Sequence, residues 1–128
     1  MRYIAIVVVV SLFVLAGCSS SGSSFEDLPE GDAANGEVIY YETINGAPAC
    51  ISCHTLTDET LVGPGLAGYS TVAATRVEGQ SAEEYTYNAI VRPATHLVEG
   101  FGNLMYTEYG TKLSEQDIAD LMAFLLTQ

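Results

Sequence analysis

Residues 50–54, Cys-Ile-Ser-Cys-His, carry the clearest chemistry in the sequence. Two cysteines separated by two residues and followed at once by a histidine form the attachment signature of a c-type haem. Each cysteine sulfur forms a thioether with one vinyl group of the porphyrin, and the adjacent imidazole lies under the ring and ligates the iron. We therefore expect Cys50 and Cys53 to hold one covalent haem c, with His54 as an axial ligand.

Two other kinds of site also use a Cys-x-x-Cys pair. A zinc site needs further nitrogen or sulfur ligands, and besides His54 the chain has only one other histidine, His96. A dithiol redox site of the thioredoxin type needs a βαβ pattern, which this sequence does not have. The sequence favours haem over both alternatives.

The second axial ligand decides what such an iron can do. Met105 lies in a glycine-bearing loop after a helix that a proline stops, which is a suitable place for a thioether ligand. Met122 falls on the apolar stripe of a helix, where methionine more often fills the core. His96 follows Pro93 closely and is expected at the surface or the haem rim. We favour Met105, with Met122 and His96 as the alternatives.

The Gly-Pro-Gly-Leu stretch at residues 63–66 is expected to form one wall of the cofactor site. A histidine bound to a metal normally donates its other ring N–H to an acceptor that fixes the ring. The carbonyl of Pro64 is the predicted acceptor for His54, and Leu66 is predicted to pack on the haem.

Three main helices must position these groups. Asp32 is a good N-cap for a helix that ends near Thr43 and carries Gly36 and Tyr40 on one face. A Ser-x-x-Glu capping box at residues 81–84 begins a helix over 82–91, which Pro93 stops. A loop then runs from residue 94 to 112. Ser114 caps an amphipathic helix that reaches the end of the chain, with Asp117 three residues on.

The N-terminal region reads as a lipoprotein signal. Arg2 precedes an almost wholly apolar run at residues 4–15, followed by Leu-Ala-Gly-Cys, which matches a bacterial lipobox. The predicted organisation is a signal peptide at 1–17, a lipid-anchored serine-rich linker at 18–31 and one domain at 32–128. Cys18 would carry the lipid. An uncleaved anchor helix is the alternative, although a bilayer span usually needs about 20 apolar residues.

The chain of 128 residues contains 4 Lys and Arg against 16 Asp and Glu, a formal charge of −12. Nucleic-acid binding is disfavoured because phosphates would be repelled. An acidic surface instead suits a partner with a basic docking face, or serves only to keep an exported protein soluble.

The chain resembles class I bacterial cytochromes c, the mono-haem electron carriers, over residues 32–128. The matching features occur in the family's order and spacing: Gly36, Tyr40, Cys50, Cys53, His54, residues 63–66, the helix from Tyr85 to its stop at Pro93, Gly100, Met105 and the helix after Ser114. The resemblance implies an all-α cytochrome c fold whose first and last helices cross, with Gly36 against the region of Leu121 and Phe124. It also implies axial ligation by His54 and Met105, and Arg76 near a haem propionate. One departure is Tyr106, where the family often has a proline.

The resemblance implies an electron carrier rather than an enzyme. The lipobox and linker are similar to those of membrane-attached cytochromes that serve respiratory complexes. Expected partners are a quinol-oxidising complex, a terminal oxidase or a reaction centre, met on the periplasmic or outer side of the membrane. A fixed electron-entry subunit of a larger oxidoreductase is an alternative, and a haem sensor or enzyme with an open iron is another.

Overall fold

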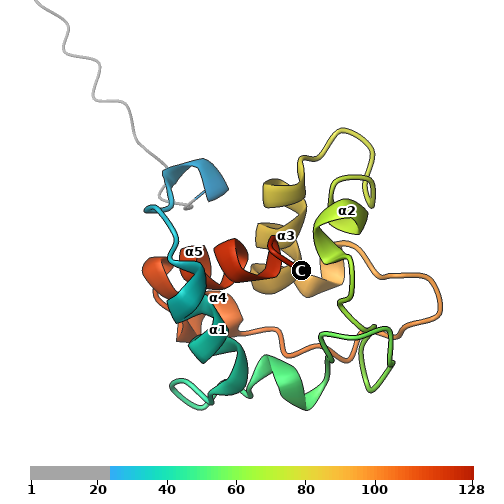
Figure 1. The fold of residues 1–128 in the computed structure, drawn as a ribbon, viewed down its shortest axis with the longest axis horizontal. Coiled ribbons are helices and arrows are strands. Elements are labelled where there is room, and N and C mark those ends of the chain that lie inside the picture. Colours follow the sequence, from blue (N-terminus) through green and yellow to red (C-terminus); the bar gives the residue numbers. More distant parts are fainter. Residues whose placement is uncertain (1–23) are drawn as a thin grey trace, which may run out of the picture.

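The computed structural model describes residues 24–128, and these residues form an all-α fold (Figure 1). The α-helices are α1 (Ala33–Tyr41), α2 (Tyr69–Ala73), α3 (Ala82–Val91), α4 (Tyr109–Lys112) and α5 (Glu115–Leu125). Three short 3-10 turns are η1 (Phe25–Asp27), η2 (Cys50–Ser52) and η3 (Pro93–Thr95). The described residues include no β-strand and no helix long and apolar enough to cross a membrane. The predicted signal peptide and Cys18 lie outside the described residues.

The three main helices begin where the sequence predicts. The Asp32 side chain accepts hydrogen bonds from two backbone N–H groups at the start of α1. Ser81 caps α3 by accepting from the N–H of Glu84, although the reciprocal half of the predicted capping box is not part of this cap. Ser114 and Asp117 form a complete capping box at α5. Each cap satisfies N–H groups that the first helical turn leaves without partners.

The C-terminal ends of two helices differ from the expectation. Helix α1 ends at Tyr41 rather than near Thr43, and α5 ends at Leu125, a few residues before the end of the chain. The helices α2 and α4 were not predicted. Both are so short that they carry less than two turns of hydrophobic periodicity, which is the signal a sequence offers for a helix.

Helices α1 and α5 cross in close contact, as the resemblance implies (Figure 1). A Cβ on Gly36 would overlap the carbonyl oxygen of Asp120 and would lie 2.8 Å from the Cβ of Phe124. The ring of Tyr40 packs against the ring of Phe124, with centroids 5.6 Å apart. A side chain at residue 36 would therefore force the two helices apart, so the glycine is needed for this crossing.

The segment before α1 also contacts the domain. Phe25 and Leu28 are partly buried against the hydrophobic core, and a Cβ on Gly31 would overlap the backbone of Ala119 in α5. Part of the stretch that the sequence assigns to the linker thus packs on the domain. Phe25 and Leu28 are isolated apolar residues in this stretch, and Gly31 has no side chain that could enter a hydrophobic pattern, so the contact was not predicted.

Asp120 joins the two crossing helices through hydrogen bonds. Its carboxylate accepts from the N–H of Asp32 (2.7 Å), the side-chain amide of Asn35 (2.7 Å) and that of Gln116 (2.8 Å), while its side chain is only 2% exposed. Burial on its own raises the pKa of Asp120, but these three hydrogen bonds outweigh it and hold the pKa below its ordinary value. The buried charge is therefore fully paired, and it fixes the start of α1 on α5.

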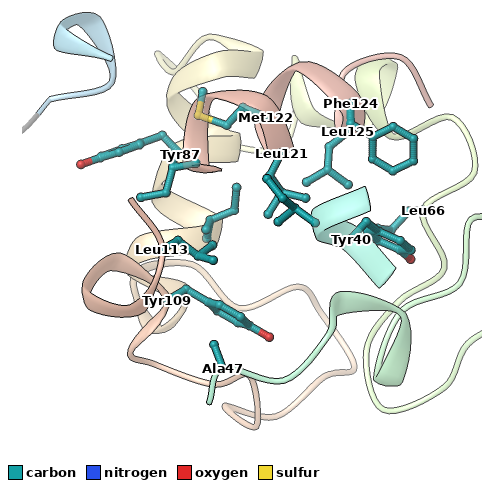
Figure 2. Close-up of a cluster of buried hydrophobic side chains, with 13 residues drawn as sticks. Tyr40, Ala47, Leu66, Tyr87, Tyr109, Leu113, Leu121, Met122, Phe124 and Leu125 are labelled. Carbon is teal, nitrogen blue, oxygen red and sulfur yellow. The ribbon is translucent and has the colours of Figure 1, made fainter. Parts of the chain in front are cut away.

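The hydrophobic core lies between α1, α3 and α5 and extends to Leu66 and Ala47 in the loops (Figure 2). Tyr40 and Leu121 are among its most completely buried side chains. Met122 is one of the core residues and is 7% exposed. This placement agrees with its expected role as core filler.

Replacing Asp120 with Asn should destabilise the protein in a pH-dependent way. At pH 7 we expect a loss of about 1–3 kcal/mol, because the amide cannot accept from all three donors. The pKa of Asp120 is lower in the folded state, so its stabilisation is fully present above the unfolded pKa of about 3.9 and is lost as the pH falls through the folded value. Denaturant unfolding should show the deficit at neutral pH and a smaller one in acid.

Glu37→Gln is the matched control, since Glu37 is an exposed acid on α1. It should change stability by less than about 0.5 kcal/mol. A deficit for Asp120→Asn that is equally large at neutral and acid pH would contradict the assigned role.

Candidate haem site

One cavity brings together most of the residues that the sequence singled out. It has a volume of about 420 Å³, and its lining includes Cys50, Cys53, His54, Pro64, Leu66 and Met105. The floor is formed partly by the crossing helices, through Tyr40 of α1 and through Leu121 and Leu125 of α5. Residues from widely separated parts of the chain thus converge on one space, which lies within the usual range of about 300–1,000 Å³ for cofactor and ligand pockets.

The two cysteines and the histidine lie on a tight turn. The carbonyl of Cys50 accepts hydrogen bonds from the N–H of Cys53 (3.1 Å) and of His54 (3.0 Å), which closes η2. The hydroxyl of the fully buried Tyr40 donates to the carbonyl of His54 at 2.7 Å. This turn places both sulfurs and the imidazole along the same cavity.

The His54 ring is held by the neighbouring loop. Its Nδ1 lies 2.9 Å from the carbonyl oxygen of Pro64, so the predicted hydrogen bond is present. An N–H at Nδ1 leaves Nε2 as the nitrogen with a free lone pair for a metal. A Cβ on Gly63 would lie 2.8 Å from Nδ1 and would overlap the ring, so only glycine admits the imidazole here. In the sequence Gly63 stands out only as part of the Gly-Pro-Gly-Leu stretch, so this role was not predicted.

The three candidates for the second ligand occupy different environments. Met105 is partly buried and lines the cavity. Met122 belongs to the core and is not among the cavity-lining residues. His96 lines the cavity but is exposed, and its ring meets that of Tyr85 edge to face with centroids 5.9 Å apart. The geometry therefore favours Met105 over Met122 and leaves His96 at the rim.

The lining is apolar and uncharged. Among the described residues that line the cavity there is no Lys, Arg, Asp or Glu, and several tyrosines supply its polar atoms. Burial raises the pKa of Tyr69 to about 12, although a hydrogen bond to Thr86 opposes the shift, and so this phenol stays neutral. A space of this kind suits the flat apolar body of a porphyrin.

Arg76 has a buried nitrogen without a hydrogen-bond acceptor. Its Nε is buried and is the one buried side-chain nitrogen or oxygen among the described residues without a hydrogen bond. Burial raises the pKa of Tyr85, and the nearby guanidinium of Arg76 opposes part of this rise. A buried guanidinium N–H without an acceptor is costly unless an anion completes the site. A haem propionate is such an anion, so Arg76 fits the role that the resemblance implies, although it does not itself line the cavity.

The cysteines do not have the character of a redox or zinc pair. Burial raises the pKa of the Cys50 thiol to about 11, whereas a reactive dithiol depends on a lowered pKa. Within residues 24–128 no three His, Cys, Asp or Glu side chains gather where they could hold a metal ion, as a zinc site requires.

The Cytochrome c family model matches residues 33–128. The chain belongs to the cytochrome c family. A search of curated proteins found no match. The match covers every helix from α1 to α5, and the predicted class I cytochrome c and its all-α fold are confirmed. As a member of this family the protein carries a covalent c-type haem and acts as a haem-based electron carrier.

The residues present fit this cofactor. The two thiols would form the thioethers, Nε2 of His54 and the sulfur of Met105 would ligate the iron, and Arg76 would pair with a propionate. When bound, the haem supplies a one-electron couple between Fe(III) and Fe(II). The chain orients the imidazole through Pro64, excludes charge from the cavity and encloses it with Leu66, Leu121 and Leu125. These assignments of individual residues remain predictions.

Covalent attachment through Cys50 and Cys53 can be tested by extraction. After denaturation in acidified organic solvent the haem should stay with the protein, because thioether bonds survive this treatment. The double substitution Cys50→Ala with Cys53→Ala should leave little folded protein, since a small domain built around an uncharged cavity needs the cofactor as filler. Recovery of the wild-type haem in the organic phase would contradict covalent attachment.

Proposed function

We propose that this cytochrome c transfers single electrons between redox complexes of a membrane, on the outer side of the cytoplasmic membrane. The observation that carries the proposal is that His54 and Met105 line one cavity without charged residues. An iron with both axial positions filled by protein side chains exchanges electrons but gives substrates little access. The protein is therefore proposed to be a carrier and not an enzyme.

Ligation by Met105 would also raise the reduction potential of the iron, which affects the partners with which it can exchange electrons. A thioether is a soft donor that stabilises Fe(II) relative to a second imidazole, and so it raises the reduction potential. The uncharged cavity acts in the same sense, because low polarity disfavours the extra positive charge of Fe(III). A carrier of this kind accepts electrons readily from a quinol-oxidising complex and passes them to an oxidase or a reaction centre.

The ligation by Met105 is the test of this function. The oxidised wild-type protein should show the weak far-red sulfur-to-iron charge-transfer band, and the reduced protein should not bind carbon monoxide. Met105→Ala should abolish the band, lower the potential and open the reduced iron to carbon monoxide. Met122→Leu is the matched control. It should keep the band, because Met122 lies in the core and a volume-conserving swap costs less than about 1.5 kcal/mol.

Two outcomes would replace the proposal. A wild-type protein that lacks the band and binds carbon monoxide has an open iron, which favours a sensor or an enzyme. A protein that lacks the band yet excludes carbon monoxide is ligated by another side chain, and His96, which lines the same cavity, becomes the first candidate. His96→Ala should then open the site.

We further propose that the protein is a lipoprotein attached to the membrane through Cys18. The Leu-Ala-Gly-Cys sequence at residues 15–18 and the serine-rich stretch after it support this. Acyl chains anchor a protein because each buried methylene contributes about 0.8 kcal/mol, and more than one chain makes the attachment stable. A tethered carrier keeps its haem domain near membrane complexes while leaving it free to turn between them.

Cys18→Ala should release the haem domain from membranes or leave an unprocessed precursor. The two products differ in mass and are separated by fractionation followed by mass spectrometry. Ser20→Ala, a change in the same stretch outside the lipobox, should leave both processing and membrane attachment unchanged. Normal processing and full membrane retention of Cys18→Ala would point to another kind of anchor.

The mouth of the cavity supports docking of a basic partner. Leu104 (72% exposed), Val62 (52%) and Leu97 (47%) line the cavity although they face solvent, so they mark its opening. Exposed acids stand in the same loops: Asp58, Glu59, Glu99 and Glu108. All 16 acids and only three cations lie in the described part of the chain. An apolar centre with an acidic border fits a partner whose face is apolar and rimmed with Lys or Arg.

Electron transfer to a lysine-rich soluble redox protein should therefore slow as ionic strength rises, because salt screens the attraction. Glu59→Lys combined with Glu99→Lys should slow it further at low salt. Glu83→Lys, on α3 and outside the loops that form the mouth, should have a smaller effect. A rate that does not depend on salt would contradict the acidic docking face. A purified domain that exchanges electrons as a monomer would exclude a permanently bound subunit.

A further inference from the structure

The loop that carries Met105 is held by few hydrogen bonds. Within residues 97–105 the hydrogen bonds are local turns: the N–H of Phe101 donates to Val98 (3.0 Å) and that of Leu104 to Gly102 (2.9 Å). No hydrogen bond among the described residues joins this stretch to another segment. A thioether on such a loop would leave the iron easily unless something holds the loop beside it.

Met105 itself packs against the hydrophobic core, and Tyr106, the next residue, begins a contact that leads out of the loop. Its ring meets the ring of Tyr109 edge to face, with centroids 5.1 Å apart. Tyr106 is partly buried and packs against the core, and both rings line the cavity. Edge-to-face pairs of this kind add about 0.5–1.5 kcal/mol beyond the area that they bury.

Tyr109 extends this contact to the haem attachment turn. Its side chain is 7% exposed, and its hydroxyl donates a hydrogen bond of 2.8 Å to the carbonyl of Pro48, two residues before Cys50. Figure 2 shows the Tyr109 ring extending from α4 toward the segment that carries Ala47. The contact thus runs from the residue after the predicted distal ligand to the residues that hold the predicted proximal ligand.

We propose that Tyr106 and Tyr109 are positioning residues that keep Met105 on the iron by fastening its loop to the attachment turn. The inference rests on the proposed ligation by Met105. The hydroxyl of Tyr106 is not needed, since its bond of 2.9 Å to the Glu108 carboxylate is exposed to solvent. The loop is held through the ring of Tyr106, which contacts the ring of Tyr109, and through the hydroxyl of Tyr109, which is bonded to Pro48.

The experiment measures how easily an added ligand displaces the methionine. Imidazole is titrated into the oxidised, haem-loaded protein, and loss of the charge-transfer band gives its affinity. When imidazole displaces Met105, the contacts of Tyr106 and Tyr109 are expected to break. A variant that already lacks one of these contacts therefore loses less free energy on displacement and binds imidazole more tightly. Tyr109→Phe removes one buried hydrogen bond and should raise imidazole affinity about fivefold. Tyr106→Ala should raise it by a similar factor or more, whereas Tyr106→Phe should behave like the wild-type protein.

Tyr69→Phe is the matched control for the lost hydroxyl. Tyr69 also lines the cavity and donates one hydrogen bond, of 3.1 Å to Thr86, but this bond joins α2 to α3 and does not involve the ligand loop. Its imidazole affinity should stay within about twofold of the wild-type value, even where its unfolding midpoint falls as far as that of Tyr109→Phe.

Equal imidazole affinities in Tyr109→Phe and Tyr69→Phe would overturn the inference, and so would an unchanged affinity in Tyr106→Ala. Either result leaves the proposed function intact as long as the wild-type protein shows the charge-transfer band. Absence of the band from the wild-type protein would instead remove the ligand on which both proposals depend.

Discussion

The close crossing of α1 and α5 is the contact on which the site depends. It is made possible by Gly36, which lets the backbone of α1 approach that of α5 at Asp120, and it is fixed by the buried carboxylate of Asp120. The same crossing places Tyr40 of the first helix beside Leu121 of the last, and both line the cavity. Helices α1 and α5 must therefore pack together before the cavity has its full lining, which links haem retention to folding of the whole domain.

The haem attachment turn is held at both ends by buried tyrosines. The hydroxyl of Tyr40 donates to the carbonyl of His54, and the hydroxyl of Tyr109 donates to the carbonyl of Pro48, so the two bonds bracket Cys50 and Cys53. A turn of few residues offers its backbone carbonyls little internal pairing, and buried carbonyls need partners. Tyrosine is suited to this task because its ring fills apolar space while its hydroxyl reaches the backbone.

Charged side chains are distributed unevenly between the cavity and the surface. The cavity lining carries no acid or base among the described residues, whereas the surface holds nearly all of the chain's many carboxylates. The cavity thus offers an apolar space for a cofactor, and an acidic exterior is the surface on which the proposed basic partner would act. Asp120 and Arg76 are the informative exceptions. The carboxylate of Asp120 is buried and accepts three hydrogen bonds, and Arg76 has a buried N–H without an acceptor, for which a haem propionate is the predicted partner.

The sequence by itself determined the chemistry and much of the framework. Residues 50–54 indicated haem, and the caps at Asp32, Ser81 and Ser114 marked the starts of the main helices, because these signals are local. The place of Gly36 in the helix crossing came from the resemblance to a known family. Tertiary structure decided what depends on distant partners. It showed that Gly63 makes room for the His54 ring, that Met105 and not Met122 reaches the cavity, and that Tyr109 meets Pro48. A glycine or a tyrosine looks the same in any sequence, and only the approach of another segment gives it a role.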